Sequence, residues 1–141
     1  MSGHVGHQGM GGYYPHPYEA DSFRAAVYKM YDLHPEDCYN RTSSILSILY
    51  LPRGKFRDGR NLLNVAAMET MIKEEANRFT YRSLHIHKLS MKEQVLCTMQ
   101  TDILLSVHGA AVATIMFLLP HSAFVELRPP NFRDNWYNLL S

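Results

Sequence analysis

The feature that most constrains the fold is one apolar segment, residues 101–120, with the sequence TDILLSVHGAAVATIMFLLP. Residues 103–107 are apolar without alternation, as expected for a β-strand that is covered on both faces. The run stops at His108 and Gly109, and residues 110–118 then have the small and apolar composition of a buried helix. The segment therefore predicts a buried strand that leads, through a two-residue hinge, into a helix.

Strands and helices alternate along most of the chain. Strands are predicted at residues 43–52, 81–89, 102–107 and 122–127. Helices are predicted around residues 23–31 and at residues 62–77, 90–101, 110–118 and 131–140. Ser90, followed three residues later by Glu93, predicts a capping box at the start of one helix. This order is typical of the α/β class, and we predict a Rossmann-like parallel sheet with flanking helices.

Length and composition indicate one globular domain. Of 141 residues, 46% are hydrophobic and 19% charged, as in soluble globular proteins. We predict a flexible leader rich in Gly, His and Tyr at residues 1–18 and an α/β domain at residues 19–141. The net charge of +1 gives no field that favours nucleic acid. No apolar run reaches the roughly 20 residues of a membrane span, and no targeting signal is visible.

The hinge at His108 and Gly109 has the composition of an anion site. In parallel sheets, ligands bind at the carboxyl ends of strands, and the N–H groups at a helix start attract phosphate. His108, Gly109, Ala110 and Ala111 are therefore candidate diphosphate-binding residues. The alternative is structural, with the imidazole bonded to a nearby carbonyl and the glycine only turning the chain. The three spaced glycines of a dinucleotide fingerprint are absent, which argues against an oxidoreductase.

Two sequence motifs carry a resemblance to a known family. Residues 89–127, LSMKEQVLCTMQTDILLSVHGAAVATIMFLLPHSAFVEL, resemble the signature region of glycosyltransferase family 61. Upstream, YLPRGKFRDGRNLLN resembles a second motif of that family, which places Arg53, Arg60 and Asn64 at its positions. The family includes secretory-pathway protein O-GlcNAc transferases and plant xylosyl- and arabinosyltransferases. One departure is Ala111, which stands where the family has a second glycine.

The resemblance implies a fold and a donor site. The family's enzymes are two-lobed (GT-B type), and this chain is similar to the C-terminal lobe, which holds the nucleotide-sugar. The resemblance assigns Arg53, Arg60 and Asn64 to the nucleotide-sugar, beside His108 and its hinge, and the two arginines suit its phosphates. The alternative for these arginines is a solvated basic loop. It assigns Glu126 to the ribose hydroxyls. Asp102 is expected to orient backbone rather than to take part in chemistry.

The implied reaction is inverting transfer from a UDP-sugar to a hydroxyl of a protein or a glycan. We expect no metal and no cofactor besides the donor, and a location in the Golgi or endoplasmic reticulum lumen. The catalytic base is not identified, and in two-lobed inverting enzymes it commonly comes from the N-terminal lobe. Only if the isolated chain transferred sugar would the base be sought among Asp58, Glu126 and His108. The expected partner is a missing N-terminal lobe or a second copy, and the isolated chain is expected to transfer poorly. The alternative is a non-catalytic nucleotide-binding or interaction module derived from the same fold.

Overall fold

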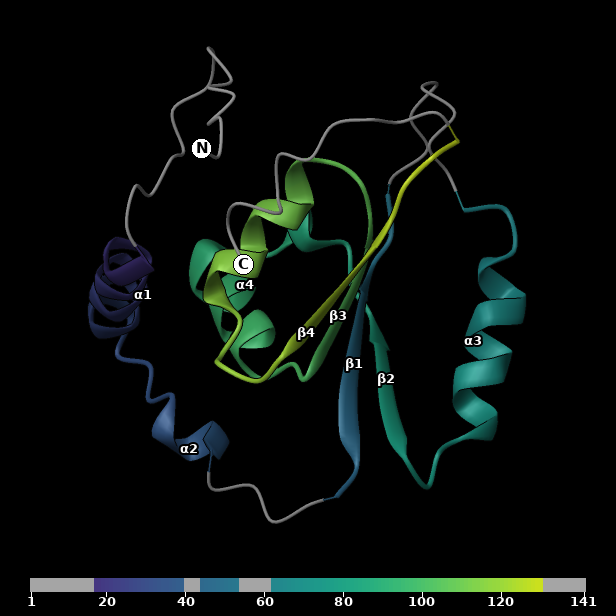
Figure 1. The fold of residues 1–141 in the computed structure, drawn as a ribbon, viewed down its shortest axis with the longest axis horizontal. Coiled ribbons are helices and arrows are strands. Elements are labelled where there is room, and N and C mark those ends of the chain that lie inside the picture. Colours follow the sequence, from purple (N-terminus) through teal and green to yellow (C-terminus); the bar gives the residue numbers. More distant parts are fainter. Residues whose placement is uncertain (1–16, 40–43, 54–61, 131–141) are drawn as a thin grey trace, which may run out of the picture.

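A parallel β-sheet organises the fold (Figure 1). The computed structural model of the protein describes residues 17–39, 44–53 and 62–130. Within these residues the strands are β1 (Leu46–Leu51), β2 (Phe79–Ser83), β3 (Ile103–Val107) and β4 (Ala123–Leu127). All neighbouring strands pair in parallel, in the order β2-β1-β3-β4. The predicted α/β class and Rossmann-like parallel sheet are confirmed.

The strand order reverses between β1 and β3. From β1 the chain passes through α3 (Val65–Glu74) to β2, and it then returns past β1 to β3 through α4 (Met91–Met99). β1 and β3 are therefore neighbours, with Leu49 opposite Leu104 and Leu51 opposite Ser106. This is a topological switch point, and parallel α/β sheets usually bind ligands at the carboxyl ends of the two strands that form it.

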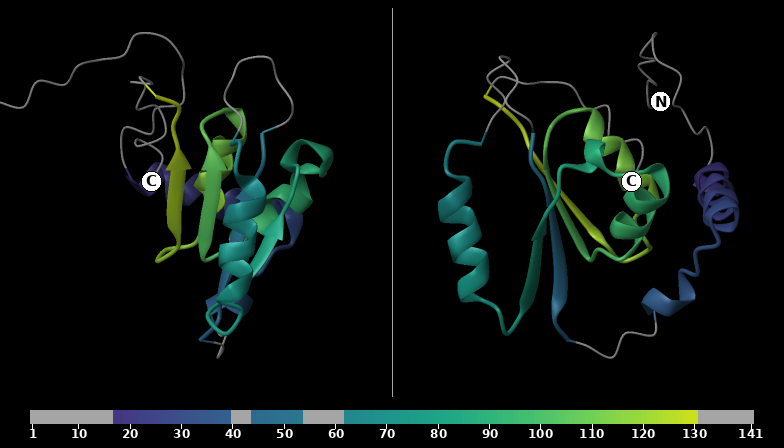
Figure 2. Two further views of the ribbon diagram at one scale, coloured as in Figure 1. Left: turned by 90° about the vertical axis from the view of Figure 1, so that its right-hand side faces the viewer. Right: turned by 180° about the vertical axis from the view of Figure 1, so that it is seen from behind.

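Helices cover both faces of the sheet (Figure 2). α3 lies over β1 and β2 on one face, whereas α4 and η2 (Ala110–Phe117) lie on the other. α1 (Pro17–Tyr31) packs outside η2, where the Tyr28 hydroxyl donates to the Phe117 carbonyl at 2.9 Å. The side chains buried between α1, α4 and η2 include Val27, Val95 and Phe117.

The main core lies between the sheet and the α4/η2 layer. Leu49 of β1 and Leu104 of β3 have no exposed surface, and they belong to a cluster with Val112 and Ile115 of η2. Burying an aliphatic side chain of this size contributes about 1.5–3 kcal/mol. The two central strands are thus covered on both faces, as their continuous apolar sequence predicts.

Asp102 ties β3 to β1 at the amino edge of the sheet. Its Oδ2 accepts from the backbone N–H of Ser47 and lies 2.7 Å from both Ser47 N and Ser47 Oγ. In return, the Asp102 N–H reaches the Ser47 hydroxyl at 2.9 Å and the Ser47 carbonyl at 3.1 Å. The Ser47 hydroxyl is also 3.0 Å from the Gln100 carbonyl. The expected backbone-orienting role of Asp102 is confirmed.

The strand predicted at residues 81–89 is wrong in its second half. β2 ends at Ser83, and Ile86–Lys88 form a short 3₁₀ helix, η1. Ile86 is buried in the core, and Leu84 and Leu89 pack against the same cluster. The apolar spacing that suggests a strand therefore comes from a short helical turn, whose apolar side chains pack into or against the core cluster.

The helix predictions that fall within the described residues hold with shifts in length, type and face. α3 is shorter than residues 62–77, and α2 (Glu36–Tyr39) was not predicted. The capping box of α4 is confirmed, since the Ser90 N–H donates to the Glu93 carboxylate at 2.7 Å and Ser90 Oγ accepts from the Glu93 N–H. On α1, Phe23 and Met30 are exposed although the periodicity predicts an apolar face for both.

Several predictions fall partly or wholly outside the described residues. These include most of the leader at residues 1–18 and the helix at residues 131–140, so the domain division remains a prediction. Within the described part, Cys38 and Cys97 are free thiols. No helix there combines the length and the apolar character that crossing a membrane requires.

Candidate functional site

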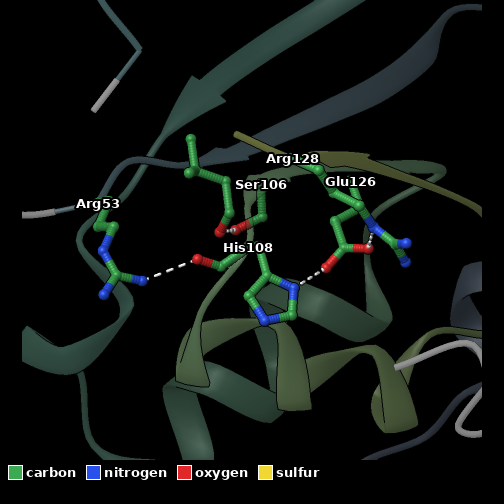
Figure 3. Close-up of polar contacts among 6 residues, drawn as sticks. Arg53, Ser106, His108, Glu126 and Arg128 are labelled. Atoms are coloured by element: carbon green, nitrogen blue, oxygen red, sulfur yellow. Dashed lines mark hydrogen bonds and ion pairs between the residues drawn. The ribbon is translucent and has the colours of Figure 1, made fainter. Parts of the chain in front are cut away.

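Three of the predicted site residues meet at the carboxyl edge of the sheet (Figure 3). Arg53 follows β1, His108 follows β3, and Glu126 lies near the end of β4. Arg53 and His108 therefore stand at the two strand ends that form the switch point. The sheet topology thus brings together residues that lie 55 positions apart in the sequence.

The parallel pairing of β3 and β4 places His108 beside Glu126. Ser106 is opposite Glu126 and Val107 is opposite Leu127 in the register. The pairing continues one residue further, because the His108 N–H donates to the Leu127 carbonyl at 3.0 Å. The imidazole Nδ1 of His108 then hydrogen-bonds Oε1 of Glu126.

Glu126 also forms an ion pair with Arg128. The Nε of Arg128 lies 2.5 Å from Oε2 of Glu126, so each carboxylate oxygen has its own partner. The side chains of His108 and Glu126 are only 9% and 7% exposed, and that of Arg128 is 28% exposed. A carboxylate this deeply buried needs such partners, because an unpaired buried charge is costly.

Arg53 lies directly over the hinge. Its Nη1 donates to the His108 carbonyl at 2.8 Å. A Cβ on Gly109 would lie 2.1 Å from the same Nη1, so the missing side chain of Gly109 makes room for the guanidinium. The backbone of Gly109 is extended, with φ 164°. The space beside Gly109 is thus filled by Arg53.

The helix after the hinge is of the 3₁₀ type, which changes the predicted anion site. The N–H of Val112 donates to the Gly109 carbonyl at 2.9 Å, so it is not available to a ligand. Hydrogen bonds in a 3₁₀ helix join residues three apart, which satisfies donors earlier than an α-helix does. Ala110 and Ala111 remain the candidates for backbone donors at this position.

Asn64, which is among the described residues, is not joined to this cluster. Asn64 is the N-cap residue of α3 and is exposed, and its side chain makes no capping hydrogen bond. Arg60 and Asp58 lie outside the described residues. Glu126 as a ribose ligand stays a prediction, although both of its oxygens already have protein partners.

Arg128 is the residue that sequence reasoning missed. Residues two apart on a strand face the same side, so Arg128 extends the face that carries Phe124 and Glu126. Phe124 packs against the core cluster on that face. The Glu-x-Arg spacing at a strand end was therefore a usable signal for an ion pair.

A second polar cluster lies under α3. The Tyr81 hydroxyl donates to Glu69 Oε1 at 3.0 Å. Burial, with the neighbouring Glu69 carboxylate, raises the pKa of Tyr81, and burial likewise raises the pKa of Tyr50. Both tyrosines thus stay neutral at physiological pH, and the cluster acts as hydrogen-bonded packing between α3 and the sheet.

A cavity of about 220 Å³ opens at the opposite, amino edge of the sheet, and Cys38, Thr101, Asp102 and Ser122 are among its lining residues. Two of its polar side chains already bond to backbone: Asp102 accepts from Ser47 N, and the Ser122 hydroxyl donates to the Thr101 carbonyl at 2.9 Å. We therefore favour the carboxyl edge, where the charged side chains gather, as the candidate site. In the described part of the chain, no group of three His, Cys, Asp or Glu side chains is arranged to hold a metal ion.

Comparison with known proteins gives one family match. The family model described as Glycosyltransferase 61 matches residues 7–125. This range includes both predicted motif regions except Glu126 and Leu127, which follow immediately after it. No curated protein matches the chain.

Proposed function

The chain belongs to glycosyltransferase family 61, and from that premise we propose that it binds a UDP-sugar at the carboxyl edge of its sheet. The proposed reaction is inverting transfer of the sugar to a hydroxyl group of a protein or a glycan. Family membership makes the protein an enzyme of the glycosyltransferase type, which acts on a donor and an acceptor.

The observation that carries the proposal is the convergence of Arg53 and His108 at the switch point. Arg53 holds the hinge through the His108 carbonyl at 2.8 Å, and its guanidinium lies against Gly109. A guanidinium pairs with phosphate through several N–H groups in a fixed plane. A diphosphate at this edge would meet a cation, an imidazole and the backbone N–H groups of Ala110 and Ala111.

These groups suit the departure of UDP. As the acceptor oxygen attacks the anomeric carbon, the bond to the diphosphate breaks and negative charge grows on the leaving phosphate. Positioned donors that face this charge lower the barrier, because they are already oriented when it develops. We propose that Arg53 and His108 supply them and that no metal ion or further cofactor takes part.

The base and the surroundings of the reaction belong to the same proposal. Glu126 is an unsuitable base, because one of its oxygens bonds to His108 and the other to Arg128. We propose that the acceptor meets its base on a second lobe of GT-B type, or on another copy of the chain. The lumen of the Golgi or endoplasmic reticulum is the proposed location.

A second candidate function is a nucleotide-binding module without transferase activity. It is favoured by the same engagement of Glu126, which leaves this carboxylate to a supporting role. Transfer assays with several UDP-sugars separate the two candidates, since a module binds UDP but releases no sugar to an acceptor.

Calorimetric titration with UDP tests the donor site. We expect a Kd below about 1 mM and a loss of about 10-fold in affinity for His108→Ala, as for other charge-assisted contacts. His121→Asn is the matched control, because His121 precedes β4 at the amino edge and asparagine tolerates its φ of 74°. Folded protein that does not bind UDP at millimolar concentration, or equal losses for both variants, would overturn the proposal.

A further inference from the structure

We propose that Glu126 is a positioning residue for His108 and that Arg128 holds Glu126 in that role. The inference rests on the proposed function, since it concerns the same diphosphate site. It replaces the ribose contact expected for Glu126 with an action through the imidazole. It also assigns a function to Arg128, which lies beyond the residues that match the family.

The carboxylate of Glu126 determines which nitrogen of His108 carries hydrogen. An ionised carboxylate only accepts hydrogen bonds, so the bond between Glu126 and Nδ1 requires hydrogen on Nδ1. Nε2 is then the nitrogen directed away from Glu126 (Figure 3). It presents a lone pair in the neutral ring and an N–H in the imidazolium. Only the imidazolium can donate to a phosphate oxygen, and the same Glu126 contact accommodates it, because Nδ1 carries hydrogen in both forms.

Arg128 fixes the direction of the carboxylate. Its Nε donates a hydrogen bond to Oε2 at 2.5 Å, which leaves Oε1 directed at the imidazole. The Glu126 side chain is 7% exposed, so water competes little for either oxygen. Two partners on one buried carboxylate restrict its rotation, and a restricted partner restricts the ring in turn, as in the outer contacts that orient metal-binding histidines.

The backbone supports the same arrangement. The His108 N–H is bonded to the Leu127 carbonyl at 3.0 Å, between Glu126 and Arg128. On the other side of the hinge, Arg53 bonds the His108 carbonyl. Both backbone polar groups of His108 and its ring Nδ1 are therefore held by neighbours. The main chain is anchored independently of Glu126, so removing that side chain should release the ring and leave the hinge in place.

The positioning role and the ribose role predict different ligand dependence. A residue that acts through His108 affects any ligand that carries a diphosphate. A residue that binds ribose affects only ligands that contain ribose. Inorganic pyrophosphate, which has no ribose, therefore separates the two roles when it is compared with UDP.

The test combines ring ¹⁵N NMR of His108 with calorimetric titration of UDP and pyrophosphate, on Glu126→Ala, Glu126→Gln and Arg128→Ala. The matched controls are Glu75→Ala and Arg78→Ala, which break an exposed Glu–Arg pair with an N–O distance of 3.5 Å. For Glu126→Ala we expect loss of the fixed tautomer and about 10-fold weaker binding of both ligands. Glu126→Gln keeps an acceptor oxygen and should recover most of both losses. Arg128→Ala should weaken the binding of both ligands about 3-fold.

Each outcome separates the inference from the proposed function. If Glu126→Ala leaves the ring ¹⁵N signals and pyrophosphate affinity unchanged, the positioning role is wrong; a loss for UDP alone would restore the ribose role. If the tautomer changes as expected but wild-type protein binds neither ligand, the positioning role stands and the donor site falls. Should Glu126→Ala unfold, as judged by circular dichroism, Arg128→Ala decides by the same two readouts.

Discussion

The two ends of strand β3 both carry buried polar residues, and they use them differently. At the amino end, Asp102 and Ser47 exchange hydrogen bonds in which backbone groups take part on both sides. At the carboxyl end, His108, Glu126 and Arg128 bond through side chains that are ionisable or charged. At the amino end, side chains therefore hydrogen-bond the backbone of the neighbouring strand. At the carboxyl end, ionisable side chains lie together at the switch point and bond to one another.

This difference indicates that the polar residues at the amino end of β3 serve stability, and that those at the carboxyl end serve ligand binding. A side chain that satisfies backbone groups cannot be changed without leaving a buried donor or acceptor unpaired. Side chains that satisfy one another can be changed at a smaller cost to the backbone, and they can exchange partners when a ligand arrives. We therefore expect substitutions at the amino end to change the free energy of unfolding, and substitutions at the carboxyl end to change the affinity for UDP.

The largest effect is expected for Asp102→Ala at the amino end. It removes the acceptor for the Ser47 N–H and hydroxyl, and we expect a loss of about 2 kcal/mol in the free energy of unfolding. UDP affinity of the folded protein should be unchanged. Urea denaturation and calorimetry measure the two quantities.

Two further variants control this prediction. Asp102→Asn keeps an acceptor oxygen, so its free energy of unfolding should fall by less than that of Asp102→Ala. Glu75→Ala removes an exposed carboxylate, so its free energy of unfolding should fall only a little. A variant at Asp102 that keeps its stability but binds UDP weakly would break the comparison between the two ends.

A smaller effect is expected for Gly109→Ala at the carboxyl end. The new Cβ would lie 2.1 Å from Arg53 Nη1, and the far end of the flexible arginine can move aside, which gives up its hydrogen bond to the His108 carbonyl. Its movement would remove a cation from the hinge, so we expect UDP to bind about 5-fold more weakly, as for loss of one charge-assisted contact.

A double-mutant cycle with Arg53→Ala identifies the cause. If Gly109→Ala acts by displacing Arg53, the double variant should bind UDP no more weakly than Arg53→Ala alone. Additive losses would instead mean that the alanine disturbs the ligand or the start of η2 directly.

The smallest effect concerns the capping box of α4, which is exposed and serves the helix alone. Hydrogen bonds from the Ser90 hydroxyl and backbone N–H lower the pKa of Glu93 from its usual 4.5. A lowered pKa in the folded state stabilises the protein above the unfolded-state value, and this contribution disappears as the pH falls through the folded-state value. The stability difference between wild type and Ser90→Ala should therefore shrink below about pH 4.5.

Denaturation at several pH values between 3 and 7 measures this difference, and UDP affinity at pH 7 serves as the control. A stability difference that stays constant across this pH range would mean that the charge of Glu93 contributes nothing to it. The whole effect would then come from the hydrogen bond that the Ser90 hydroxyl accepts from the Glu93 N–H. An altered UDP affinity would show that the start of α4 belongs to the donor site.

Much of the fold could be predicted because it depends on local patterns. A continuous apolar run predicts a covered strand, and Ser90 with Glu93 predicts a helix start, whatever surrounds them. The predictions failed where tertiary packing overrides the local pattern. Residues 84–89 alternate like a strand, yet Ile86 turns into the core. Met30 fits the period of an apolar helix face, yet it is exposed, and the buried cluster takes Val27 and Tyr28 from α1.

The candidate site shows the same division. The sequence by itself determined that His108 and Gly109 end a buried strand and that arginines follow an earlier one, since these are statements about neighbours in the chain. Only the tertiary structure decided that Arg53 occupies the space beside Gly109, and that Glu126 bonds to His108. Such partnerships depend on strand order and on a parallel register, in which a shift by one residue turns each side chain to the other face of the sheet. They join residues 18 and 55 positions apart, across distances that local sequence patterns do not specify.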